Sequence, residues 1–248
     1  MKPKPNPRLD IQSVLILKAD RIYGDALCKI VQRILPWADV RLETSINGAS
    51  AALAIRPVEL LITGVGASLG GDVIDFLSMH MGGSNGVRQV LVVTTHHELR
   101  ILAALRGLAV HGMFDSAAEA PENLAEAIRV IACGQFYWSQ SILDRIRADV
   151  ASGRSHARLL TPCEQLVLCV IGGGCDNVTA ARELGMTPGT ISSVRRDLHR
   201  KLGVQHRGEL MCIAAQVGFV QFTPSGILRP GYALLTAAHR GRKPKSVA

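Results

Sequence analysis

The fold of the C-terminal part is decided by two segments that read LLTPCEQLVLCVIGGGCDN (residues 159–177) and TPGTISSVRRDLHRKLGV (residues 187–204). In each segment a threonine followed by proline supplies a helix N-cap and a first helical residue whose backbone angle is already suited to a helix. Glu164 adds the second half of a capping box, because it stands three residues after Thr161. We therefore expect one helix to begin in each segment.

Glycines and apolar spacing set the limits of these helices. The first has apolar residues at three- and four-residue spacing and ends at Gly172–Gly174, and the helix of the second segment ends at Gly203. Another helix is expected at Asn177–Leu184, followed by a tight turn at Gly185. A last helix at Arg207–Val217 closes the set. Four short helices with a glycine turn between the second and third are typical of a helix-turn-helix unit.

The stretch also carries a recurring residue pattern: Leu-Thr before a Glu, a Gly before Asn and Ala, and Lys-Leu-Gly-Val before an Arg and a Glu. The positions are Leu160, Thr161, Glu164, Gly174, Asn177, Ala181, Leu184, Thr187, Thr190, Ile191, Lys201, Leu202, Gly203, Val204, Arg207 and Glu209. Through them the stretch resembles the C-terminal domain of LuxR-type (NarL/FixJ family) bacterial transcription regulators. The resemblance implies a unit that binds DNA with its third helix.

The resemblance also assigns roles to single residues. Those placed at base edges are Ser192, Ser193 and Arg196, and those placed at phosphates are Thr187, Thr190, Arg200, Lys201 and Arg207. Their chemistry agrees, because an arginine can pair bidentately with guanine and hydroxyl or ammonium groups suit phosphate oxygens. A solvated basic face on a small helical bundle would explain the charges, but not two capped helices joined by a glycine turn.

The chain departs from the family pattern at four positions in this stretch. Ser192 and Val194 stand where a Lys and a His are usual, and Cys163 and Val178 stand where basic residues are usual. Several customary DNA contacts are therefore missing. We expect the affinity for DNA to depend more on Arg196, on Arg200, on dimer formation and on the basic C-terminal tail.

The N-terminal part, residues 11–151, alternates short apolar runs with amphipathic stretches. Strands are expected at 14–17, 40–42, 60–63, 90–94 and 112–114, and helices at 24–35, 49–54, 73–80, 98–105 and 121–133. Five strands alternating with five helices predict an α/β doubly wound parallel five-stranded sheet that is covered on both faces.

This order resembles the receiver domain of two-component response regulators, with a local match from Ala127–Arg129 to Ser139. A receiver is phosphorylated through acids after the first strand, an aspartate after the third, a hydroxyl after the fourth and a lysine after the fifth. Those places hold Lys18 and Ala19, Thr63, Thr94 and Ser116. Only the hydroxyl survives, so the sequence predicts a degenerate receiver.

The loss of the acids has a chemical consequence that does not depend on the family. Mg²⁺ needs carboxylate oxygens, and a phosphoryl acceptor needs a carboxylate nucleophile. We expect Lys18 to occupy the space of a metal and the domain to stay unphosphorylated. Its remaining uses are to dimerise, to bind a small ligand or partner protein, or to shield the DNA-binding helix. The expected dimer faces are residues 24–35 or 113–133.

Four regions follow from these assignments. They are a receiver-like domain (9–138), a linker helix and linker (139–157), a LuxR-type helix-turn-helix domain (158–220) and a basic C-terminal extension (221–248). The net charge is +8, and its excess lies in residues 1–8 and in the extension. The extension is expected to be a disordered basic arm that follows a phosphate backbone or enters a minor groove, with a solubilising tail as the other interpretation.

Composition narrows the class of protein. No apolar run reaches the roughly 18 residues of a membrane span, which predicts a cytoplasmic protein that is nucleoid-associated when bound to DNA. The six cysteines have no Cys-x-x-Cys pair, so we expect buried, reduced thiols and neither a zinc site nor disulfides. No catalytic triad or phosphate-binding loop is evident. We expect neither an enzyme nor a cofactor.

The sequence thus favours a sequence-specific DNA-binding transcription regulator of the atypical response-regulator kind. Its expected partners are double-stranded DNA, a second copy of the chain, and RNA polymerase or another regulator. Two alternatives stay open. One is a quorum-sensing (acyl-homoserine lactone) receptor, which shares the C-terminal domain; the other is an adaptor or antagonist that has lost DNA binding through Ser192 and Val194.

Overall fold

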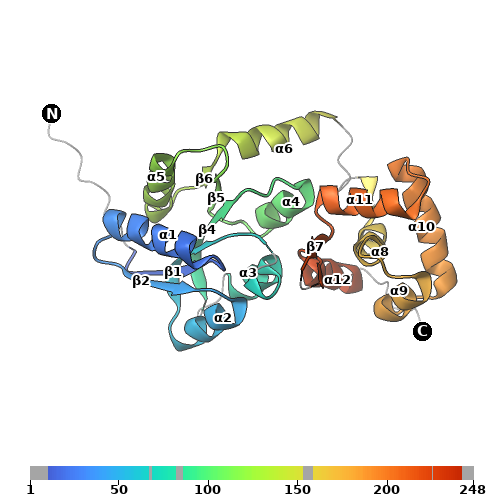
Figure 1. The fold of residues 1–248 in the computed structure, drawn as a ribbon, viewed down its shortest axis with the longest axis horizontal. Coiled ribbons are helices and arrows are strands. Elements are labelled where there is room, and N and C mark those ends of the chain that lie inside the picture. The colour runs from blue at the N-terminus through green and yellow to red at the C-terminus, as the bar shows by residue number, and fades with distance from the viewer. Residues whose placement is uncertain (1–10, 67–68, 82–85, 153–158, 225, 242–248) are drawn as a thin grey trace. The chain divides into compact units, whose positions relative to one another are not determined.

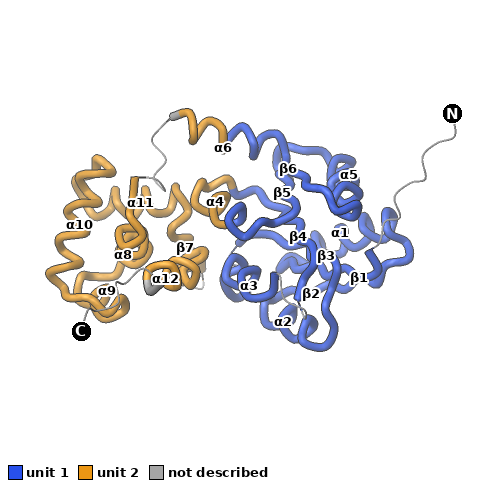
Figure 2. The backbone as a smooth tube through the Cα atoms, turned by 180° about the vertical axis from the view of Figure 1, so that it is seen from behind, with its two compact units in different colours: residues 1–96, 105–145 blue, residues 97–104, 146–248 orange. Residues whose placement is uncertain are grey.

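The computed structural model describes residues 11–66, 69–81, 86–152, 159–224 and 226–241. These residues divide into two compact units, which are coloured separately in Figure 2. Unit 1 contains the residues up to His96 together with Leu105–Arg145. Unit 2 contains His97–Ala104 together with the residues from Ile146 onward.

Unit 1 is built on a parallel six-stranded sheet with strand order β2-β1-β3-β4-β5-β6 (Figure 1). The strands are β1 (Ser13–Leu17), β2 (Asp39–Glu43), β3 (Val58–Thr63), β4 (Val87–Thr94), β5 (Gly112–Asp115) and β6 (Tyr137–Trp138). The helices of this part of the chain are α1 (Arg21–Ile34), α2 (Ile46–Ile55), α3 (Val73–His80), α4 (Leu99–Gly107), α5 (Pro121–Ala132) and α6 (Gln140–Ser152). The expected doubly wound parallel sheet is confirmed.

Two expectations for unit 1 need correction. The sheet has six strands rather than five, because Tyr137 and Trp138 pair with Gly112 and Met113. A strand of two residues shows no periodicity, so the sequence pattern alone does not reveal it. Helix α1 begins at Arg21, three residues earlier than expected, because the Asp20 side chain caps it by accepting from the Tyr23 N–H at 3.0 Å.

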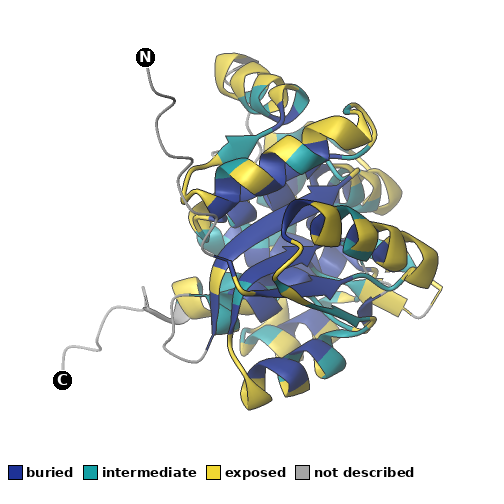
Figure 3. Cartoon of the chain, turned by 90° about the vertical axis from the view of Figure 1, so that its left-hand side faces the viewer, coloured by how far each residue is buried: buried dark blue, intermediate teal, exposed yellow. Residues whose placement is uncertain are grey.

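The core of unit 1 follows from the alternation of side chains along the strands. Val14 and Ile16 pack with residues of α1 and α5, whereas Leu15 lies on the opposite face and is equally buried. Figure 3 shows the buried strands between helices whose outer faces are exposed. Burial on both faces explains why the central strands are continuous apolar runs.

The carboxyl ends of the central strands form one edge. Leu17 pairs with Thr63 and Thr63 with Val92, while Thr94 pairs with Asp115. The residues that follow β1, β3, β4 and β5 are therefore neighbours along this edge, although they are distant in sequence.

Unit 2 contains α8 (Pro162–Gly172), α9 (Asn177–Leu184), α10 (Pro188–Leu202) and α11 (Arg207–Val217). These are the four helices that the caps and glycines predict. The capping box of Thr161 and Glu164 is present, and Gly185 and Gly203 end their helices in the left-handed conformation, with φ of 64° and 68°. The four helices bury an apolar cluster that includes Val167, Ile191 and Leu198.

The expectation of a disordered C-terminal arm is wrong for residues 221–224 and 226–241. They form the hairpin of β7 (Gln221–Thr223) and β8 (Gly226–Leu228), followed by α12 (Tyr232–Gly241). Tyr232 and Leu235 pack against the apolar cluster of unit 2. Apolar side chains thus order this segment, whereas the basic Arg242, Lys243 and Lys245 lie outside the described residues.

Two predictions from composition can be compared with the structure. Cys169 is buried, but Cys133 and Cys212 are exposed, so the expectation of buried thiols is wrong for those two. Among the described residues, no helix is both long and apolar enough to cross a membrane.

One partly buried ion pair joins the start of α8 to the end of α10. The Lys201 ammonium lies 2.8 Å from a Glu164 carboxylate oxygen, and the same oxygen accepts from the Thr161 N–H at 2.8 Å. Burial raises the pKa of the Glu164 carboxyl, but the hydrogen bonds from Lys201 and Thr161 outweigh it, so the pKa lies below its ordinary value. The native state therefore favours the charged carboxylate.

A stability test follows from this lowered pKa. Because the native pKa lies below the unfolded value, the stabilisation is present above pH 4.5, the ordinary value, and is lost as the pH falls through the native pKa. We expect Glu164→Gln to lower the free energy of unfolding by about 1 to 2 kcal/mol at pH 7. The variant should then lose less stability on acidification than the unaltered chain does. Urea unfolding followed by circular dichroism, at pH 7 and at a pH below the ordinary value of 4.5, measures this difference.

The control is Glu126→Gln, which removes an exposed ion pair with Arg129 and should change stability by less than about 0.5 kcal/mol. Equal losses for the two variants at pH 7 would contradict a stabilising role for the pair of Lys201 with Glu164.

Candidate nucleic-acid interface

Helices α9 and α10 are joined by a three-residue turn that fixes where α10 begins. The N–H of Gly185 bonds to carbonyls at the end of α9. Thr187 then caps α10, because its hydroxyl accepts from the Thr190 N–H at 3.1 Å, and the two hydroxyls lie 2.9 Å apart. Local hydrogen bonds thus set the direction of α10 relative to α9.

Helix α10 has one buried side and one open side. Ile191 and Leu198 are fully buried, with Val194 packed on the same core. The opposite side is exposed at Gly189, Ser193, Arg196 and Arg200. This spacing of four, three and four residues follows one face of a helix. We call these four residues the α10 stripe; Ser192 lies beside it and is half-buried.

The two arginines of the α10 stripe differ in their surroundings. Arg196 is exposed and has no hydrogen-bond or ion-pair partner within the part of the chain that the structure describes. Arg200 is 75% exposed and lies 2.7 Å from the Asp197 carboxylate. An exposed pair of this kind contributes little stability, so Arg200 can exchange it for another anion at small cost.

The remaining predicted DNA contacts are engaged within unit 2. Lys201 is bound to Glu164 and also donates to the Leu159 carbonyl at 3.3 Å. Arg207 is exposed but donates to the carbonyl of Gly174, in the loop before α9. Both residues therefore hold the helices together, and their contact with phosphates stays a proposal.

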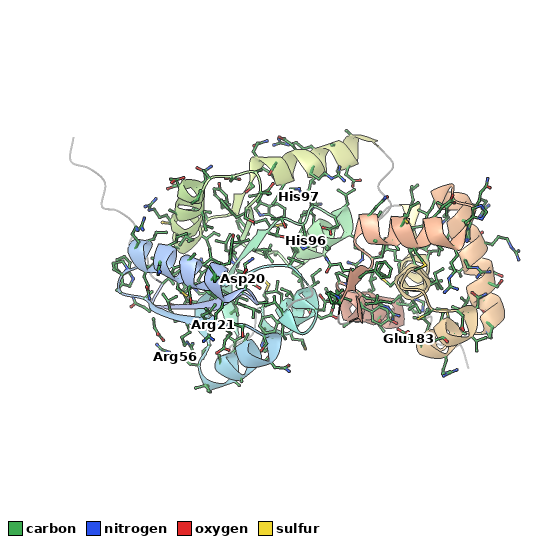
Figure 4. The ribbon with its side chains drawn as sticks, viewed as in Figure 1. Asp20, Arg21, Arg56, His96, His97 and Glu183 are labelled. Atoms are coloured by element: carbon green, nitrogen blue, oxygen red, sulfur yellow. The ribbon has the colours of Figure 1, made fainter. Side chains whose placement is uncertain are left out.

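A side-chain cluster that the sequence patterns do not reveal joins α9 to the C-terminal extension. Glu183, labelled in Figure 4, forms an ion pair with Arg229 and accepts from the Tyr232 hydroxyl at 2.8 Å. Burial and the hydrogen bond to Glu183 raise the pKa of Tyr232. The cluster ties the helix that precedes α10 to residues 229–232. Nothing local in the sequence pairs positions so far apart.

The five predicted positions of the degenerate phosphorylation pocket meet at the carboxyl edge of the sheet. The Lys18 ammonium crosses to the Val93 carbonyl at 3.2 Å. Thr63 donates to the Gly64 carbonyl at 3.1 Å, and the Thr94 hydroxyl accepts from the His96 N–H at 2.9 Å. Ser116 donates its N–H to the Thr94 carbonyl, and Ala19 follows Lys18 in the chain.

One buried carboxylate at this edge is not indicated by the sequence patterns. Asp115, the last residue of β5, is fully buried and accepts from the Ala117 N–H at 3.0 Å and from the Ser141 hydroxyl at 2.7 Å. Its oxygens therefore brace the turn before α5 and the start of α6. Over the described residues, no three His, Cys, Asp or Glu side chains are grouped as a metal ion would need.

Comparisons with known proteins agree with this geometry. Residues 158–214 match the luxR family of bacterial regulatory proteins. The chain is 30% identical over 99 residues to the transcriptional regulatory protein MctR of Rhizobium johnstonii, which covers 40% of this chain and 45% of MctR. It is 28% identical over 160 residues to the nitrate/nitrite response regulator NarL of Escherichia coli K12, which covers 57% of this chain and 72% of NarL.

The chain thus spans less than half the length of MctR. Solved structures of the regulator RcsB share its fold. One is the complex of the response regulator RcsB with DNA, with a TM-score of 0.53 and 21% identity. Another is RcsB of Salmonella enterica serovar Typhimurium bound to the promoter P1flhDC, with a TM-score of 0.56 and 22% identity. Each match covers 84% of this chain and 100% of the other. Residues 158–214 therefore form a domain of the luxR family of bacterial regulatory proteins, and the N-terminal unit has the receiver-like fold that it shares with RcsB.

Proposed function

We propose that this chain is a sequence-specific DNA-binding transcription regulator that works as a dimer and without phosphorylation. The observation that carries the proposal is the α10 stripe, which presents Ser193, Arg196 and Arg200 on the open face of a capped helix. A helix with such a face fits the major groove, where arginine can read guanine. That MctR and NarL are named as regulators supports the same function.

The roles within the interface divide by exposure. Arg196, with Ser192 and Ser193 beside it, is proposed to read base edges. Phosphate contacts are proposed for Arg200 and for Thr187, Thr190, Lys201 and Arg207. Lys201 and Arg207 can reach phosphates only by sharing or leaving their present partners, so we expect Arg200 to supply more of the phosphate attraction.

The two alternatives receive less support. A quorum-sensing receptor would need an acyl-homoserine lactone pocket in unit 1, but the strands there pack against helices with apolar side chains on both faces. An adaptor without DNA binding is favoured by Val194 and Ser192. However, Arg196 and Arg200 are exposed, as DNA contacts must be.

The DNA-binding proposal is tested with duplexes selected from a random library by the full chain. We expect Arg196→Ala to weaken binding of the selected duplex by about tenfold or more and to relax the preference at one base pair, because a bidentate contact is worth roughly 1–3 kcal/mol. Arg200→Ala should weaken all duplexes alike and reduce the slope of log affinity against log salt by about 0.9. Fluorescence anisotropy across a salt series measures both effects.

The matched control is Arg195→Ala on the same helix. Arg195 is half-buried and donates to the Asn177 side chain at 3.2 Å, so its loss should leave the selected sequence unchanged. Selection of the same sequence by the Arg196→Ala variant, with equal affinity, would refute the proposed reading face.

Phosphorylation independence is proposed from the chemistry of the sheet edge. Lys18 and Thr63 stand where a metal-binding acid and an acceptor carboxylate would be required. Asp115 is the buried carboxylate of this edge, and its oxygens already accept from backbone N–H groups and from Ser141. Asp20 also lies near this edge, but its carboxylate caps α1 by accepting from the Tyr23 N–H. None of the positions that stand in place of the receiver's acids therefore supplies a carboxylate nucleophile.

We expect acetyl phosphate with Mg²⁺ to leave the intact mass of the chain unchanged and its affinity for the selected duplex the same. A response regulator with an intact acceptor aspartate, treated in parallel, is the positive control. Incorporation of one phosphoryl group per chain in a Mg²⁺-dependent manner would overturn this part of the proposal.

The dimer is proposed to form through α1 and α5, which pack side by side. A groove of about 300 Å³ between them is lined by Ile30, Ile34, Pro121 and Ala125, with Arg33, Arg129 and Glu122 at its sides. Arginines and a glutamate in one groove suit a two-fold pairing, because the same patch on a second copy offers the opposite charges. Paired units would let two copies of α10 meet half-sites on one duplex.

The dimer interface is tested by Ala125→Glu, which places a charge on the apolar floor of the groove. We expect this variant to sediment as a monomer at a micromolar concentration where the unaltered chain is a dimer. The control, Ile55→Glu, alters an 85% exposed residue at the end of α2 and should stay dimeric. A monomeric unaltered chain that binds one half-site tightly would count against the dimer.

A further inference from the structure

A second cavity lies in unit 1 where β1 and β3 end. Its volume is about 240 Å³, and its walls are Lys18, Asp20 and Tyr23 on the β1 side and Gly64, Gly66 and Leu69 on the β3 side. Figure 4 shows Asp20 at this edge, at the start of α1. In the strand order β2-β1-β3-β4, the chain leaves β1 for β2 on one side and returns to β3 on the other. Doubly wound sheets open a ligand crevice at such a switch point.

The cationic group of this cavity is the Lys18 ammonium. It lies above Gly64 so closely that a methyl group there would be 2.6 Å from Nζ, and the Tyr23 ring centroid is 4.7 Å away. An ammonium has three N–H donors, and the Val93 carbonyl takes one of them. Glycine at position 64 therefore leaves room for a lysine that reaches over the strand ends with donors to spare.

The charges around Lys18 define what the cavity can hold. Burial lowers the pKa of Lys18, and Asp20 acts in the opposite direction. A half-buried ammonium gains from an oxyanion that accepts its remaining hydrogen bonds. The nearby Asp20 carboxylate, which caps α1 through the Tyr23 N–H, repels a bare anion but accepts from a hydroxyl group.

We propose that this cavity binds a small hydroxylated organic anion whose carboxylate or phosphate pairs with Lys18 and whose hydroxyl donates to Asp20. The cavity is smaller than the roughly 300 to 1,000 Å³ of sites for drug-sized ligands. It therefore suits a ligand of the size of a sugar phosphate or a hydroxy acid. This binding does not depend on DNA recognition, so the two proposals can fail separately.

The test is isothermal titration of the full chain with glucose 6-phosphate, which offers a phosphate, and with citrate, which offers carboxylates. Glucose and sodium chloride at matched ionic strength are the controls. Saturable binding of either organic anion, without binding of glucose, supports the site and tells which oxyanion it prefers. The proposal is overturned if neither anion binds at millimolar concentration, or if glucose binds as well.

Variants locate the binding. Lys18→Met removes the ammonium and keeps most of the apolar stem, so it should weaken binding by about tenfold or more. Lys29→Met, at an exposed position on α1, should leave binding unchanged. Gly66→Leu narrows the cavity from the β3 side, where a Cβ meets only His96 at 3.8 Å; it should also abolish binding, and it keeps the test valid if Lys18→Met does not fold. Binding by folded Lys18→Met or Gly66→Leu as tight as that of the unaltered chain would overturn the assignment.

Discussion

The burial of one side of α10 is the constraint on which the proposed interface depends. Ile191 and Leu198 fix the helix in the core of unit 2, and the pair of Lys201 with Glu164 ties its end to the start of α8. Because side chains on a helix recur every 3.6 residues, fixing these positions also fixes Ser193, Arg196 and Arg200 on the open side. The packing of the buried side of α10 thus determines which residues its open side offers to the proposed interface.

At the carboxyl edge of the sheet in unit 1, the residues differ from those that a receiver uses. Where a receiver needs acids to hold a metal, this chain has a lysine that supplies its own positive charge, and a glycine at position 64 that makes room for it. These two positions are linked, since a Cβ at position 64 would lie 2.6 Å from the Lys18 ammonium, which would then have to move. The edge therefore keeps a receiver-like fold, and its side chains place a lysine beside a cavity; the proposed loss of phosphoryl transfer rests on this replacement.

The parts of the structure that the sequence predicts are those set by neighbours along the chain. Asn177–Leu184 and Pro188–Leu202 are found as expected, because their caps and glycines lie within a few residues of the helix ends. The parts that it does not predict depend on distant residues. Tyr137 pairs with Gly112, and Leu235 of the extension packs on the core of unit 2.

The same distinction applies to the candidate sites. Sequence spacing brings Lys18, Thr63, Thr94 and Ser116 to one edge because each ends or directly follows a parallel strand. It does not show that Asp115 is buried there or that Lys201 is held by Glu164, since such partners lie far apart along the chain. A residue type at a family position therefore indicates what the side chain can bind, whereas only the fold shows what it already binds.

This distinction bears on how strongly one copy of the chain can hold DNA. Thr187 and Thr190 bond to each other, and Lys201 and Arg207 bond within unit 2. This leaves Arg196 and the exposed, paired Arg200 as the cations of the α10 stripe. Each phosphate contact adds roughly one unit of salt dependence, and specific sites of single modules draw on several such contacts. With so few uncommitted cations, one α10 would distinguish an operator poorly from other DNA. Two copies joined through α1 and α5 double the contacts without any change in α10, and this is the physical reason to expect the dimer.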